Sequence, residues 1–124
     1  MDKIDRINAI NPDLAIEVHL NSNEDSSYSG HEFLYYPTSK SGKYVAEKLL
    51  EWHSYYWNRP FCDGLSPRSD LAFLKYTKCP AVITEQLFLS NDKEAKHLKE
   101  LNFSHTTMAW ALMLAIDDIV KGRP

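Results

Sequence analysis

Cysteine and glycine are scarce in this sequence, and it contains no long apolar run. The 124 residues include two cysteines, four glycines and six prolines. Two cysteines without a C-x-x-C pair exclude a disulfide scaffold and a thiol-rich zinc site. No stretch of about 18 apolar residues occurs, so we expect no membrane span. The first residues include no apolar core segment, so we expect no signal peptide in this chain.

An excess of charge of one sign is also missing. Fourteen basic and seventeen acidic residues give a formal net charge of -3. A basic face is needed to bind nucleic acid, so we expect no nucleic-acid partner. Charged residues occur in mixed clusters such as Asn91–Glu94, which we interpret as solvated helix surface. Apolar residues make up 44% of the chain, which is typical of a globular protein, and the length predicts one domain over residues 1–124.

Apolar periodicity predicts strands that alternate with helices. We expect strands over residues 14–20, 31–36, 71–76 and 81–89, and helices over 2–11, from Ser39 or Ser41 to about Tyr56, from Ser90 to about Leu101, and over about 104–121. Residues 58–70 are expected to form a loop. This alternation predicts an α/β fold with a central, mostly parallel or mixed, sheet flanked by helices.

Two polar side chains interrupt apolar strands. His19 follows Glu17 on one face of the first predicted strand, and Glu85 lies within the most hydrophobic strand. A buried carboxylate is costly unless it is paired, protonated or close to a metal. Both residues lie toward the C-terminal part of their strands, where α/β proteins form their sites. A histidine ligand and a glutamate base beside zinc form a hydrolytic site, but the residues alone leave ordinary structural roles open.

Three segments together resemble one family. Residues 6–21 read RINAINPDLAIEVHLN, residues 30–36 read GHEFLYY, and residues 80–91 read PAVITEQLFLSN. In order and spacing they resemble the zinc-dependent N-acetylmuramoyl-L-alanine amidases of cell-wall hydrolases and phage endolysins. The resemblance covers nearly the whole chain.

The resemblance implies a peptidoglycan hydrolase with zinc as its cofactor. Such enzymes use zinc-activated water to cleave the amide between N-acetylmuramic acid and L-alanine. His19 matches the second zinc-binding histidine of the family, and Glu85 matches its catalytic glutamate. The strand in residues 30–36 is implied to border the cleft. The endolysin resemblance also implies a protein that is made in the cytoplasm and released to act on the cell wall.

The family's first zinc histidine and its glutamate ligand have no counterpart in the chain. We therefore expect the chain to correspond to the C-terminal two-thirds of the catalytic domain. Glu17 and His31 are speculative substitutes for the missing ligands. One alternative is a non-catalytic remnant that binds the cell wall or a partner, and another is a different zinc hydrolase with a rearranged site. A sheet edge left bare would also allow a homo-oligomer.

Overall fold

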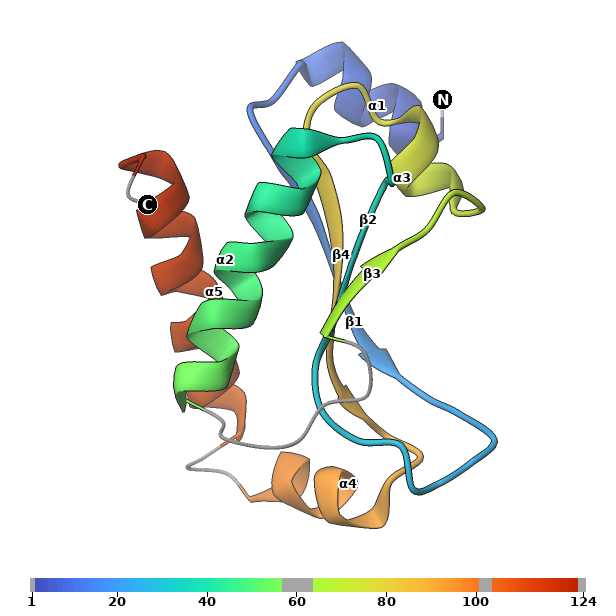
Figure 1. Ribbon diagram of the computed structural model, residues 1–124, viewed down its shortest axis with the longest axis vertical. Helices are drawn as coiled ribbons and strands as arrows, with labels where there is room; N and C mark the ends of the chain where they lie inside the picture. Colours follow the sequence, from blue (N-terminus) through green and yellow to red (C-terminus); the bar gives the residue numbers. More distant parts are fainter. Residues whose placement is uncertain (1, 57–63, 101–103, 123–124) are drawn as a thin grey trace.

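The computed structural model describes residues 2–56, 64–100 and 104–122, which build a four-stranded mixed sheet with helices around it (Figure 1). The strands are β1 (Ala15–Asn21), β2 (Glu32–Tyr35), β3 (Gly64–Pro67) and β4 (Ala81–Phe88), and the helices are α1 (Lys3–Ile10), α2 (Lys40–Tyr56), α3 (Ala72–Tyr76), α4 (Asp92–Lys99) and α5 (Ser104–Val120). The strand order is β1-β4-β2-β3. β1 pairs with β4 and β2 with β3 in parallel, whereas β2 and β4 are antiparallel. The predicted α/β class is confirmed.

Helices cover both faces of the sheet. α2 and α5 lie side by side on one face, and α4 lies at the opposite end of the molecule from α1 and α3 (Figure 1). Phe33, Leu49, Val82 and Ala115 belong to the core under α2 and α5. The core on the other face includes Ile7, Leu34, Phe73 and Ile83. β4 is therefore covered on both sides, which explains its nearly continuous apolar sequence. None of the helices in the described ranges has the length and apolar character needed to cross a membrane.

Short polar side chains determine where several helices begin. The Asp2 carboxylate accepts a hydrogen bond from the Asp5 backbone N–H at 2.8 Å, and the Ser39 hydroxyl accepts one from the Gly42 N–H at 2.9 Å. These bonds satisfy backbone donors that have no partner within the first helical turn. Of the two predicted starts of α2, Ser39 is therefore the residue that caps the helix. α4, which was predicted to begin at Ser90, is capped by Asn91.

Two sequence predictions for the middle of the chain are wrong. The segment predicted as a strand over residues 71–76 contains helix α3, which buries Phe73 and Leu74 against the sheet. Apolar runs this short fit a strand or a helix equally well, and tertiary packing decides between them. The predicted loop over residues 58–70 contains β3, whose pairing with β2 is a long-range contact. The earlier part of that loop lies outside the described residues.

β1 forms one edge of the sheet. Within the described ranges it pairs only with β4. Val18 and Leu20, on the face opposite to His19, are 54% and 37% exposed. β1 is therefore an edge strand of the described sheet, and the use of this edge in a homo-oligomer stays a prediction.

His53 lies on the apolar face of α2 and is packed in the core, as that position predicts. Its Nδ1–H donates to the Leu49 carbonyl at 2.7 Å, and its Nε2 accepts from the Gln86 amide at 2.9 Å. The ring of His31 lies 5.4 Å away, centroid to centroid. Burial, and secondly the charge of a protonated His31, lower the pKa of His53 to about 4. The imidazole of His53 is therefore neutral in the folded protein at neutral pH.

We expect acid to destabilise the fold through His53. The pKa of His53 falls from its ordinary 6.5 to about 4 in the folded protein, so the unfolded chain binds more protons between these pH values. The free energy of unfolding therefore decreases as the pH falls through this window, by about 3 kcal/mol for the full shift. Urea unfolding at neutral pH and near pH 4 measures the change. His53→Gln does not titrate and can still accept from Gln86, so it should show a smaller decrease; an equal decrease would contradict the prediction.

Candidate active site

His19, Glu85 and Glu32 form a row across three adjacent strands. His19 of β1 and Glu32 of β2 are both in register with Glu85 of β4. Residues directly opposite each other on neighbouring strands project to the same face of a sheet. The row therefore brings an imidazole and two carboxylates together near the carboxyl ends of the parallel strands β1 and β4, where sites in α/β sheets form.

The His19 ring lies between two carboxylates. Its Nε2 is 2.6 Å from Glu17 Oε1, and its Nδ1 is 3.4 Å from Glu85 Oε1. Glu17 also binds the Lys3 ammonium group, with Nζ 2.5 Å from Oε2. Burial opposes the charged form of Glu17, but the hydrogen bonds from Lys3 and His19 outweigh it and lower the pKa of the carboxyl group. Glu17 is therefore ionised at neutral pH and orients the imidazole.

Glu85 is the most buried of the carboxylates around His19. Its side chain is 13% exposed, and its Oε2 is buried without a hydrogen bond to any part of the chain that the structure describes. Burial raises the pKa of Glu85; the charge of His19 opposes this rise, and the charge of Glu32 adds to it. A carboxyl group with a raised pKa exchanges protons more readily near neutral pH, as general acid–base catalysis requires.

A polar cavity of about 300 Å³ opens beside Glu85. Its described lining consists of Asn21, Ser22, Asn23, Tyr28, Glu32, Leu34, Arg68, Glu85 and Phe88. The Asn21 amide donates to Glu32 Oε2 at 3.0 Å and so connects the end of β1 to β2 across β4. Arg68, which follows β3, is the only cation among these residues. The cavity therefore combines a candidate acid–base group, amide and hydroxyl groups, and one guanidinium group.

Glu94 anchors the loop that forms one rim of this cavity. Its Oε1 accepts from the backbone N–H groups of Gly30, at 2.7 Å, and Phe88, at 3.1 Å. The prediction that residues 91–94 are solvated surface is wrong for Glu94, which is completely buried. The two N–H groups replace water around its carboxylate. The Asn91-x-x-Glu94 spacing, typical of a helix start, is the sequence signal that places Glu94 in the first turn of α4.

His31 does not join His19. It is completely buried, its Nδ1 lies 2.9 Å from the Gln86 carbonyl oxygen, and its ring contacts those of Phe33 and His53. The predicted grouping of His19, Glu17 and His31 is therefore not found. The reason is that His31 turns toward α2, whereas His19 lies on the face that carries Glu85.

The described residues offer part of a zinc site. The imidazole nitrogens of His19 and the neighbouring carboxylate oxygens are of the kinds that zinc prefers. In the described ranges, however, no three His, Cys, Asp or Glu side chains are arranged to hold a metal ion. Both ring nitrogens of His19 already contact carboxylates. These residues therefore provide one candidate ligand but do not form a complete site.

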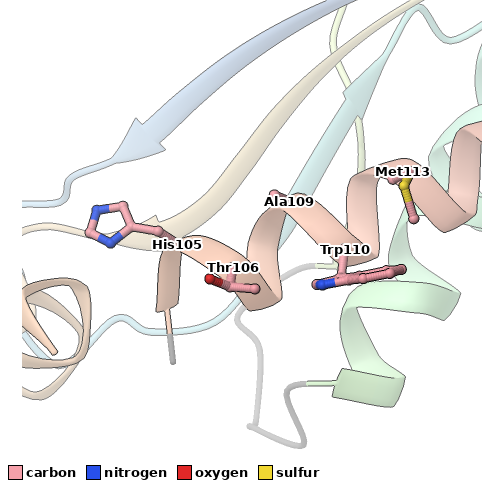
Figure 2. Close-up of a pocket in the computed structure, with 5 residues that line it drawn as sticks. All are labelled: His105, Thr106, Ala109, Trp110 and Met113. Atoms are coloured by element: carbon pink, nitrogen blue, oxygen red, sulfur yellow. The ribbon is translucent and has the colours of Figure 1, made fainter. Parts of the chain in front are cut away.

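A second hollow, of about 440 Å³, lies on α5 and is mostly apolar. Figure 2 shows its five lining side chains, which are His105, Thr106, Ala109, Trp110 and Met113. They include no carboxylate that could act as a base on a substrate. The polar cavity is the candidate active site because it contains Glu85 and Glu32 near the carboxyl ends of β1 and β4.

The architecture and the polar cavity define an α/β protein with a polar site near the carboxyl ends of two parallel strands. Residues 1–118 match the N-acetylmuramoyl-L-alanine amidase family. The chain belongs to this family. The resemblance seen in the three sequence segments is thereby confirmed.

Individual relatives agree with this assignment. The endolysin of Bacillus phage SPP1 is 30% identical over 107 residues, which cover 83% of this chain and 39% of the endolysin. The CwlD amidase from Clostridioides difficile superimposes with a TM-score of 0.87 at 27% identity, over 95% of this chain and 59% of CwlD. The catalytic domain of the CD27L endolysin targeting Clostridia difficile has a TM-score of 0.78 and 29% identity, over 94% of this chain and 60% of that domain. The chain thus spans less than two thirds of the length of each of these relatives.

Proposed function

We propose that this chain acts in a peptidoglycan hydrolase that cleaves the amide between the lactyl group of N-acetylmuramic acid and L-alanine. The observation that supports this most is Glu85, a largely buried carboxylate beside His19 in a polar cavity. The amidase family and the endolysin relative indicate the same substrate class. By likeness to that endolysin, we further propose that the protein is made in the cytoplasm and released to act on the cell wall.

Glu85 serves first as a general base and then as a general acid. Its carboxylate accepts a proton from the water molecule that attacks the amide carbonyl carbon. It then donates this proton to the amide nitrogen as the C–N bond breaks. The water thus supplies a hydroxyl group to the carbonyl carbon and one hydrogen to the leaving amine. The products are a lactyl carboxylic acid, which loses its proton at neutral pH, and the free amino group of L-alanine, and Glu85 returns to its starting state.

We propose zinc as the cofactor and His19 as one of its ligands. Zinc, when bound, polarises the carbonyl group and lowers the pKa of a bound water to about 7. To act as a ligand, His19 has to release its contact with Glu17 or with Glu85 at one ring nitrogen. At least one of the remaining ligands has to come from residues other than those described, because these do not form a three-ligand set.

Digestion of purified peptidoglycan tests the proposed reaction. We expect mass spectrometry to find free stem peptides with a new amino-terminal L-alanine, together with glycan strands that keep their lactyl carboxylates. A chelator should stop the release, and added zinc should restore it. Products cut within the peptide or between the sugars would contradict the amidase assignment.

A second candidate is a non-catalytic protein that binds the cell wall. It is favoured by the incomplete ligand set in the described residues. Such a protein would sediment with peptidoglycan without releasing any L-alanine amino groups, and Glu85→Gln would leave its binding unchanged. The digestion experiment therefore separates the two candidates.

A further inference from the structure

We propose that Arg68 binds a free carboxylate on the peptide side of the scissile amide, and so makes the enzyme selective for acidic stem peptides. This inference rests on the proposed amidase function. It concerns the part of the polar cavity that Arg68 lines.

Arg68 reaches the cavity from a different part of the sheet than the acid–base group. Its backbone N–H donates to the Tyr35 carbonyl at 2.9 Å, and Tyr35 lies three residues along β2 from Glu32. Three residues of strand correspond to roughly 10 Å. The Arg68 side chain nevertheless lines the same cavity as Glu32 and Glu85. The cavity is therefore lined by two carboxyl groups, those of Glu32 and Glu85, and by the positively charged guanidinium group of Arg68.

One edge of the Arg68 guanidinium group is occupied by Asp70. Arg68 Nε donates to Asp70 Oδ1 at 2.8 Å, and Nη2 donates to Oδ2 at 2.7 Å. The arginine lowers the pKa of Asp70 to about 2, so this partner is ionised at neutral pH. The bidentate pair fixes the plane of the guanidinium group before any ligand arrives.

The other edge of the guanidinium group is available to a ligand. A guanidinium group has five N–H donors in a fixed fork, and its Nη1–Nη2 end matches a second carboxylate. In the part of the chain that the structure describes, Nη1 makes no hydrogen bond, and Nη2 keeps a second N–H besides the one that it donates to Asp70. The side chain is 40% exposed, so solvent and ligands can reach it.

The charges in the cavity determine which group binds where. Glu32 and Glu85 repel an anion from their part of the cavity, and the charge of Glu32 also acts on Arg68. Because Arg68 is the only cation in the described lining, it is the group that accepts a substrate carboxylate. In the proposed reaction, the leaving peptide begins with L-alanine and continues with a γ-linked glutamate residue. The α-carboxyl group of this residue is a free carboxylate in some cell walls and a carboxamide in others. Arg68 distinguishes these two forms, because the amide carries no charge and offers only one acceptor oxygen.

Binding of two muramoyl tripeptides tests the inference. They differ only at the second residue, which carries a free α-carboxylate in one and a carboxamide in the other. Calorimetric titration uses the full chain with Glu85→Gln, so that neither peptide is cleaved. We expect the carboxylate form to bind about tenfold more tightly, as the loss of one charge-assisted hydrogen-bonded contact implies. Arg68→Met in the same background should remove this preference.

Two further variants make the comparison specific. Arg68→Lys keeps the charge but not the fork, so it should retain only part of the preference, and it serves as the test if the methionine variant does not fold. Arg6→Met removes an equal charge from the exposed surface of α1, away from the cavity, and should leave the preference unchanged.

Equal affinity for the two peptides, no binding of either, or a preference that survives both Arg68 substitutions would overturn the inference. Cleavage of the same peptides by the unsubstituted protein is measured in parallel. A preference that depends on Arg68 without any amide cleavage would support the anion site and refute the amidase function, so the two failures are distinguishable.

Discussion

Glu85→Gln is expected to reduce amide cleavage by roughly 10²- to 10⁴-fold, the contribution typical of a general acid–base group. Glutamine has nearly the same shape as glutamate, but it does not take a proton from the attacking water. We expect the bound zinc content to stay the same, because Glu85 contacts His19 without being a proposed ligand. Release of L-alanine amino groups from peptidoglycan, with zinc measured on the same samples, provides both values.

Glu47→Gln is the matched control for this prediction. Glu47 is an exposed residue of α2 and does not line the cavity. The control removes the same charge and should leave cleavage unchanged. Unreduced activity in Glu85→Gln would refute the role that we assign to Glu85.

His19→Ala is expected to abolish both zinc binding and cleavage. An exposed imidazole that lies between Glu17 and Glu85 is the best candidate for a metal ligand in the described structure. Elemental analysis should find about one zinc per chain in the unsubstituted protein and little in the variant, since a catalytic zinc site has three protein ligands and is weakened by the loss of one.

His105→Ala provides the comparison for His19→Ala. His105 is an exposed histidine on α5, in the apolar hollow rather than in the polar cavity. Its removal should leave the zinc content unchanged. Zinc retained in His19→Ala would place the metal elsewhere, and no zinc in the unsubstituted protein would favour the non-catalytic alternative.

The candidate site was predictable from the sequence only where its residues interrupt apolar strands. His19 and Glu85 attract attention because a polar residue in such a strand has to find a partner. Arg68 carries no such signal, because it lies in a polar stretch in which an arginine is ordinary. Glu94 belongs to a mixed charged segment and is identified as buried only through its bonds to the distant Gly30 and Phe88. His31 was predicted to lie near His19 because it stands at the start of a predicted strand. Its side chain turns toward α2 instead, and the sequence did not reveal this.

The elements of the fold that local sequence patterns specify were predicted, and those that depend on long-range contacts were not. β4 was predicted from its nearly continuous apolar sequence, and α2 and α5 from the helical spacing of their apolar residues. α3 and β3 were not, because each is only a few residues long and owes its conformation to the sheet against which it packs. The mixed character of the sheet follows from β2, which runs antiparallel to β4.

The sequence by itself determined the α/β class, the two polar strand residues and the family resemblance, since these depend on local patterns and the order of motifs along the chain. Only the tertiary structure decided which side chains meet. Strand register brings Glu85 between His19 and Glu32, and the crossing of distant segments brings Arg68 into the same cavity. Contacts of this kind depend on pairing between residues far apart in the chain, and periodicity within a single element does not determine that pairing.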